Sequence, residues 1–271
     1  MADAKFMKRF LLPGITAFLI GFFAINSQLN AQSPVAAGDL KNSVNAPKKS
    51  FVLLELFTSE GCPTCPPADA NLAFLEKEQP FADTEIVTLA LHIDYLNSVV
   101  WKDLYSSPIF SRRQQLYSQA LKIGATYTPQ MIVDGHTGFT GSNLAKAQKA
   151  ILEAAKSPKA TIEIIQTDEI LKVKIADVPA HQTATIFLAV IENNLISNRK
   201  SNNSTNKKVE LISAARELKS IGMLPTEQSS LELETVLQIP PAWKKENLKF
   251  IVFVQENASR RVLGVNRKSS L

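Results

Sequence analysis

Short apolar runs in the first half of the chain predict buried parallel strands. The runs at 51–57 and 85–91 are rich in apolar residues and too short for helices, and a segment with helical spacing at 68–75 lies between them. Strand, helix and strand in this order form a βαβ unit, in which both strands are parallel and end at the same edge of the sheet. Side chains that follow these two strands are therefore expected to lie close together.

Two more helices and a hairpin complete the first half. Helical spacing predicts one helix at about 108–123 and another at 144–156. The segment 127–133 between them is typical of a strand, and the dipeptide Asp134-Gly135 that follows it is a strong signal for a hairpin turn. These elements all belong to the predicted α/β half of the chain.

In the second half the pattern changes to alternation of apolar and polar positions, which is typical of strands with one buried face. Two segments, 183–191 and 248–254, are more continuously apolar, as strands buried on both faces would be. The pattern at 211–221 does not distinguish helix from strand. We therefore predict an α/β domain at 50–158, followed by an all-β antiparallel sandwich domain at 159–271.

The N-terminus has the features of an export signal. Lys5, Lys8 and Arg9 precede an apolar run at 10–25, and the small residue Ala31 suits cleavage after it. An uncleaved membrane anchor is the alternative, but a run of about 16 residues is shorter than the roughly 20 that span a bilayer. We therefore favour a cleaved signal peptide.

Cleavage determines both the location and the charge of the mature chain. We expect a signal peptide at 1–31 and a flexible linker at 32–49, and hence a periplasmic or secreted protein with no membrane association after cleavage. The full chain carries a net charge of +5, to which the signal contributes +2, so that +3 is left. This small excess, with no basic run interleaved with aromatic residues, does not predict nucleic-acid binding.

The chain has only two cysteines, Cys62 and Cys65, which follow the first predicted strand where a helix is expected to begin. Helix N–H groups and their partial positive charge would stabilise a thiolate at Cys62 and lower its pKa. Cys62 would then attack a substrate disulfide, and Cys65 would resolve the mixed disulfide. The pair predicts a redox-active disulfide that needs no other cofactor, whereas an inert structural disulfide is the alternative.

Five other residues are candidates for roles at this edge of the sheet. His92 follows the second predicted strand and would accept the proton of Cys65, with Asp94 as its electrostatic partner; a loop histidine bound to backbone is the alternative. Thr128 and Pro129 begin a predicted strand, and a cis bond between them would turn the Thr128 backbone outward to bind a substrate strand. Trp101 is either a substrate platform or a core side chain.

Two rival functions use the same residues differently. Two thiolates and a histidine, either His92 or His136, would form a soft site suited to Cu(I), as in a copper metallochaperone. A non-catalytic binding protein that uses the second half of the chain is the other rival. Zinc is less suitable, because the chain has no second cysteine pair to complete its ligands.

Four sequence blocks resemble a bacterial family of secreted thioredoxin-like proteins, the domain of unknown function 1223. The blocks are LFTSEGCPTCPPAD at 56–69, HIDY at 92–95, WKD at 101–103 and YTPQM at 127–131. The resemblance implies a thioredoxin-like fold at 50–158 and export, but no known substrate. We therefore predict an exported thiol–disulfide oxidoreductase that acts on thiols or disulfides of exported proteins, with an unidentified redox partner.

Overall fold

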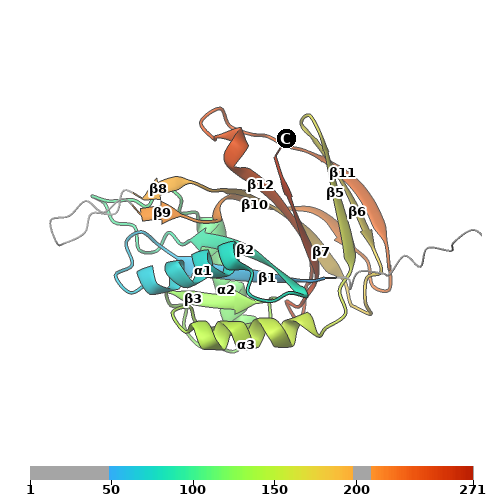
Figure 1. Cartoon of the computed structure of the whole chain (residues 1–271), viewed down its shortest axis with the longest axis horizontal. Coiled ribbons are helices and arrows are strands. Elements are labelled where there is room, and N and C mark those ends of the chain that lie inside the picture. Colours follow the sequence, from blue (N-terminus) through green and yellow to red (C-terminus); the bar gives the residue numbers. More distant parts are fainter. Residues whose placement is uncertain (1–48, 198–208, 271) are drawn as a thin grey trace, which may run out of the picture. The chain divides into compact units, whose positions relative to one another are not determined.

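A computed structural model describes residues 49–197 and 209–270 of the chain (Figure 1). The predicted signal peptide and the linker up to residue 48 lie outside the described residues, so the structure does not test them. The described residues belong to one compact unit. None of the helices in this part of the chain is long and apolar enough to cross a membrane.

The predicted βαβ unit is confirmed. Strands β1 and β2 are parallel and paired over their whole length, from Ser50 opposite Thr84 to Thr58 opposite His92. The predicted hairpin is confirmed as well, because β3 and β4 pair in antiparallel fashion. The elements of this half are β1 (Ser50–Thr58), α1 (Pro66–Glu78), β2 (Thr84–His92), α2 (Pro108–Ala120), β3 (Gln130–Val133), β4 (Thr137–Thr140) and α3 (Leu144–Ala155).

The three helices cover the two faces of these strands. Helices α1 and α3 pack on one face, where side chains such as Leu72 and Ile151 contact Leu54 and its neighbours on β1. Helix α2 packs on the other face through Phe110 and Tyr117. Alternate residues of β1 and β2 point to opposite faces, so both faces are buried and most residues of these strands are apolar.

The second half is composed of strands. A three-stranded antiparallel sheet in the order β11–β6–β5 packs against β7, β10, β12 and β13, and alternate residues of each strand fill the interface. The elements are β5 (Thr161–Thr167), β6 (Ile170–Ala176), β7 (Ala184–Glu192), β8 (Leu195–Ser197), β9 (Val209–Leu211), β10 (Ala214–Leu224), β11 (Leu231–Val236), a short 3-10 helix (Lys245–Asn247), β12 (Leu248–Glu256) and β13 (Val262–Ser269).

One large sheet crosses the boundary predicted at residue 158, which corrects the expectation of a separate sandwich. Its eight strands run in the order β13–β12–β7–β10–β2–β1–β3–β4, so strands of both halves share it (Figure 1). Within this sheet the two halves are joined by a single parallel pair, Ala214 and Ala90, where the Ala90 N–H donates to the Ser213 carbonyl over 2.8 Å. Without this contact β2 would be an unpaired edge. The fold is therefore a mixed α/β fold with a large mixed sheet and smaller antiparallel sheets.

A buried ionic cluster also ties the two halves together. The Arg113 guanidinium on α2 binds both carboxylate oxygens of Glu55 on β1, with the Nε to Oε1 distance at 2.5 Å, and donates to Gln255 on β12 over 3.1 Å. The Tyr117 hydroxyl bridges Arg113, Glu55 and Gln255. Burial alone would lower the pKa of Arg113, but the Glu55 carboxylate raises this pKa above its ordinary value. We call these four residues the arginine cluster.

Candidate functional site

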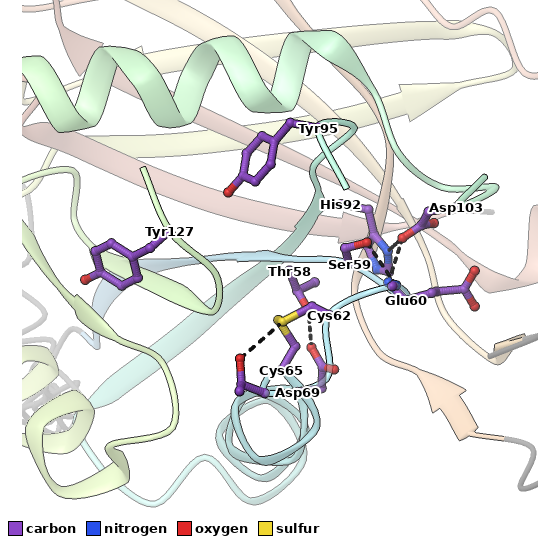
Figure 2. The surroundings of a disulfide bond; sticks show 12 residues. Thr58, Ser59, Glu60, Cys62, Cys65, Asp69, His92, Tyr95, Asp103 and Tyr127 are labelled. Carbon is purple, nitrogen blue, oxygen red and sulfur yellow. Dashed lines mark hydrogen bonds and ion pairs between the residues drawn. A yellow bond between two sulfur atoms is a disulfide. The ribbon is translucent and has the colours of Figure 1, made fainter. Parts of the chain in front are cut away.

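The two cysteines form a disulfide in the turn between β1 and α1, as predicted (Figure 2). Both are almost closed to solvent, because Cys62 exposes 2% of its surface and Cys65 exposes none. The hydroxyl of Thr64 lies 3.5 Å from Sγ of Cys62. A disulfide sulfur carries no proton, so the hydroxyl is the donor in this contact. Cys62 is the more accessible residue of the two.

Helix α1 begins at Pro66, one turn later than the predicted start at Cys62. A helix that began earlier would need the nitrogens of Pro66 and Pro67 to donate to carbonyls one turn back, and proline has no N–H. The two residues after the prolines donate instead to the carbonyl oxygen of Cys65, over 2.8 and 3.0 Å. Cys65 is therefore the N-cap residue, and fewer helix N–H groups are available to a Cys62 thiolate than predicted.

His92 lies where the βαβ unit predicts, at the end of β2 and opposite Thr58 at the end of β1. Its partner is not Asp94, which corrects that expectation. The imidazole Nδ1 is 2.8 Å from Oδ2 of Asp103. The Asp94 carboxylate turns instead toward α2 and accepts the hydroxyl of Ser111. The reason is geometric, because the loop after β2 folds back and brings Asp103, rather than Asp94, to the imidazole.

Asp103 is the functional candidate that sequence reasoning missed. Its carboxylate is fully buried and also accepts the N–H groups of Glu60 and Tyr105, over 2.8 and 2.9 Å. Burial alone would raise the pKa of Asp103, but the hydrogen bonds from His92 and these two N–H groups outweigh it and hold the pKa below its ordinary value. The signal for Asp103 was the WKD block at 101–103, which contains it. We call His92, Asp103 and Glu60 the aspartate cluster.

A second carboxylate, Asp69, lies close to the disulfide. It belongs to the first turn of α1, one turn after Cys65, and its Oδ1 accepts the hydroxyl of Thr58 over 2.7 Å. Figure 2 shows the Asp69 side chain beside Cys65 and turned toward Thr58. The block at 56–69 contains this residue, but its sequence position alone does not show that it returns to the end of β1.

Trp101 packs against the turn that carries Cys62. A Cβ atom added to Gly61 would lie 2.7 Å from Cζ3 of Trp101, so the indole ring covers the residue before the cysteine. The ring is partly buried in this position. Trp101 is therefore neither a core side chain nor a free platform, and its loop contacts the disulfide turn.

Thr128 and Pro129 lie at the same edge of the sheet as the disulfide. The bond between them is cis, and the next residue, Gln130, pairs with Phe57 near the end of β1. The carbonyl of Tyr127 accepts the side chain of Gln114 over 2.7 Å, and the carbonyl of Pro129 accepts the N–H of residue 141 over 3.0 Å. The main-chain N–H and C=O of Thr128 bind no other residue of the described chain.

Two tyrosines lie near this segment. Figure 2 shows the ring of Tyr127 on the opposite side of the disulfide from Asp103, and the ring of Tyr95 above the disulfide. The Tyr95 hydroxyl donates to Gln114 over 3.0 Å, which joins the loop after β2 to α2 and the start of β3. Burial raises the pKa of both tyrosine hydroxyls above the ordinary value, so both stay protonated at neutral pH.

The structure shows the candidate copper ligands in other contacts. The two cysteines are joined to each other, and His92 directs its Nδ1 to Asp103. Within 49–197 and 209–270, no group of three or more His, Cys, Asp or Glu residues could hold a metal ion. His136, the other histidine considered, lies beside the β3–β4 turn with its Nδ1 3.4 Å from the Asp134 carbonyl.

The fold is similar to those of two solved structures. One is a protein of Agrobacterium tumefaciens, a structural genomics target, with 22% sequence identity and a TM-score of 0.67; the match covers 82% of this chain and 95% of that one. The other is HBP35 of Porphyromonas gingivalis, with 13% identity and a TM-score of 0.57, covering 82% of this chain and 76% of that one. At these identities the likeness concerns the fold alone.

No curated protein matches this chain. A family model described as a protein of unknown function, DUF1223, matches residues 53–255. The match begins on β1, includes the disulfide and the aspartate cluster, and ends on β12, so it spans both halves of the large sheet. The chain therefore belongs to the DUF1223 family.

Proposed function

We propose that this chain is an exported thiol–disulfide oxidoreductase that works through the Cys62–Cys65 disulfide. The observation that carries the proposal is the position of the disulfide, in the turn between β1 and α1 where the parallel strands end. The order strand, Cys-x-x-Cys, helix, strand, helix, Thr-Pro strand, hairpin and helix supports a thioredoxin-like architecture for 50–158. The pattern at 1–31 supports export to a compartment where disulfides persist.

The proposed reaction transfers two electrons and two protons. A substrate thiolate attacks Sγ of Cys62, the more exposed residue, which forms a mixed disulfide and breaks the bond to Sγ of Cys65. Cys65 leaves as a thiolate and takes up a proton. A second substrate thiolate then attacks the substrate sulfur of the mixed disulfide, which oxidises the substrate and releases Cys62. In the reverse direction, the reduced pair converts a substrate disulfide to two thiols.

Substrate binding beside the disulfide is supported by Thr128. Its main-chain donor and acceptor make no hydrogen bond to other described residues, although the strand that follows is fully buried. An extended substrate segment would satisfy both groups by adding a short strand, as in β-augmentation. The indole of Trp101, which lies on Gly61, would form a wall of the same site.

In the reverse direction, where the reduced pair reduces a substrate disulfide, the proton of Cys65 needs an acceptor, and Asp69 is the better placed candidate. It lies on the first turn of α1 next to Cys65, whereas His92 directs its Nδ1 to the buried Asp103 carboxylate. A carboxylate within reach of a thiol, directly or through one water, can accept its proton as a general base. We assign His92 a positioning role, because Asp103 binds both its imidazole and the backbone of the disulfide turn.

Cysteine replacement tests the proposal. In an insulin-reduction assay with dithiothreitol as reductant, the wild type is expected to turn over and Cys62→Ser to lose turnover. Cys65→Ser is expected to trap the mixed disulfide, because the resolving thiol is absent. Both variants are checked for the wild-type unfolding midpoint under reducing conditions, which separates lost chemistry from lost structure.

The pH dependence of Cys62 alkylation provides the second measurement. A functional thiol is expected to react with an apparent pKa below the ordinary value of about 8.5. An ordinary thiol pKa together with no insulin turnover by the wild type would contradict the proposal. A non-catalytic binding role would then explain the chain better.

A further inference from the structure

The loop between β2 and α2 exposes an unusual amount of apolar surface. Fourteen large hydrophobic side chains are exposed among the described residues, and six of them lie within residues 95–109. Val99, Val100 and Leu104 expose 105%, 93% and 68% of their surface. The six residues are Tyr95, Leu96, Val99, Val100, Leu104 and Ile109. We call this segment the apolar loop. Apolar side chains gathered in this way on a surface indicate a binding site.

Polar side chains fill the interior of the apolar loop, where they bind one another and the main chain. The Asn97 side chain accepts the N–H of Asp103 over 3.0 Å and donates to the hydroxyl of Ser106 over the same distance. The Ser106 hydroxyl in turn donates to the Asp103 carbonyl over 2.8 Å. Ser98 and Trp101 close a tight turn through a main-chain bond of 2.8 Å. The hydrogen bonds therefore hold the loop in a shape that presents its aliphatic side chains outward.

This polar interior joins the apolar loop directly to the disulfide turn. The Asp103 carboxylate accepts the N–H of Glu60, and the ring of Trp101 lies against Gly61, the residue before Cys62. Figure 2 shows the bond between Asp103 and Glu60 next to the disulfide. Trp101 and Asp103 of the apolar loop therefore contact the turn that carries Cys62.

We propose that the apolar loop docks an extended, apolar segment of an unfolded polypeptide whose cysteine exchanges with the Cys62–Cys65 disulfide. The inference rests on the proposed function and specifies its substrate class. The burial of both sulfurs favours a single extended chain over the rigid surface of a folded protein, and Thr128 supplies main-chain hydrogen-bonding groups for such a chain. Within the loop only Lys102 is an exposed charge, so most of the exposed surface is uncharged and suits apolar side chains.

Two cysteine peptides of equal length test the docking. In one peptide the cysteine is flanked by leucines and in the other by serines, and glutathione serves as a small thiol without flanking residues. The measured quantity is kcat/KM for reduction of the Cys62–Cys65 disulfide, in which two peptide thiols become one peptide disulfide. The wild type is expected to prefer the leucine peptide by roughly tenfold, the order expected when a few aliphatic side chains are buried.

A triple variant removes the surface without touching the site. Val99→Ser, Val100→Ser and Leu104→Ser together are expected to abolish the preference for the leucine peptide, while the rate with glutathione stays unchanged. The matched control carries Met223→Ser and Val236→Ser, which replace exposed apolar side chains outside the apolar loop. The control is expected to keep the wild-type preference. The urea midpoint of each variant verifies that it is folded.

The possible outcomes separate the two proposals. A triple variant that keeps the preference would overturn the docking proposal and leave the proposed function intact. A wild type that reacts with neither peptide nor glutathione would remove the proposed function, and the docking proposal with it. If the wild type sediments as a dimer, the triple variant as a monomer, and neither prefers the leucine peptide, a second copy of the chain occupies the loop instead.

Discussion

The arginine cluster and the aspartate cluster each bury a carboxylate, yet they lie in different parts of the fold. In the first, Arg113 lies about 5 Å from the rings of Phe187 and Phe253, and its partners come from β1, α2 and β12. In the second, Asp103 binds His92 and the backbone of the disulfide turn at the edge of the sheet. Burial of charge therefore does not mark a functional site by itself. What distinguishes the candidate site is that its buried carboxylate lies at the ends of the parallel strands.

The largest expected effect comes from the arginine cluster. Arg113→Ala leaves the Glu55 carboxylate buried without its charge partner, and loss of one member of such a pair costs about 3–5 kcal/mol of unfolding free energy. Urea unfolding measures this loss. The exposed neighbour Arg112 provides the control, because Arg112→Ala is expected to change stability by less than about 0.5 kcal/mol.

The double variant Glu55→Leu, Arg113→Met refines this prediction. It removes both charges, and it is expected to be more stable than Arg113→Ala, because no unpaired charge stays buried. A double variant no more stable than the single one would mean that packing, rather than charge pairing, is what the cluster contributes. The comparison with the aspartate cluster would then lose its electrostatic basis.

The aspartate cluster is expected to contribute less to stability. In Asp103→Asn one carboxylate oxygen becomes an NH₂ group that faces donors, which costs about 1–3 kcal/mol. Amide hydrogen exchange in residues 95–109 is expected to be faster in this variant. Asp94→Asn is the control, since its carboxylate accepts a hydroxyl, which can also donate to an amide oxygen. An equal loss of unfolding free energy in both variants would show that the Asp103 carboxylate contributes no more to stability than the Asp94 carboxylate.

The pH dependence of this loss has a definite sign. The folded-state pKa of Asp103 lies below its unfolded value of about 3.9, so its contribution is complete above that pH and disappears as the pH falls through the folded-state pKa. The stability difference between the wild type and Asp103→Asn is therefore expected to be larger at pH 7 than in acid. Urea midpoints measured across this range check it.

The smallest expected effect on stability is that of Asp69→Asn. The amide keeps an oxygen for the Thr58 hydroxyl, so the unfolding free energy is expected to change by less than about 1 kcal/mol. Loss of a general base, in contrast, typically slows a reaction by at least about 100-fold. The readout is the rate at which the reduced protein reduces a peptide disulfide, which is expected to fall by about 100-fold in Asp69→Asn and to stay near the wild-type rate in His92→Gln. The reverse result would assign the proton to His92.

Much of the local structure followed from sequence patterns. The apolar runs and the helical segment predicted the βαβ unit, and the hairpin at Asp134-Gly135 was correct, with φ of 48° and 76° at these two residues. Local rules of this kind suffice where each element is determined by its own residues. Pro66 and Pro67 are also local, and their missing N–H groups explain why the predicted helix start at Cys62 was too early.

The contacts between distant segments could not be predicted in this way. Segment 211–221 had an ambiguous pattern, and its residues 214–221 belong to β10, which completes the large sheet by one pair between Ala214 and Ala90. The partner of His92 was predicted to be Asp94, whereas the loop brings Asp103 instead. Sequence separation is a poor guide to such pairs, because the path of a loop depends on what its ends are attached to.

By itself the sequence determined that two cysteines, a histidine and a Thr-Pro segment lie at one end of parallel strands, because strand direction and spacing are local properties. Only the tertiary structure decided that the strands of both halves form one sheet, that Asp103 joins the histidine to the disulfide turn, and that the apolar loop faces outward beside it. These features depend on pairings between residues far apart in the chain, and such pairings form only where packing brings their backbones and side chains within contact distance.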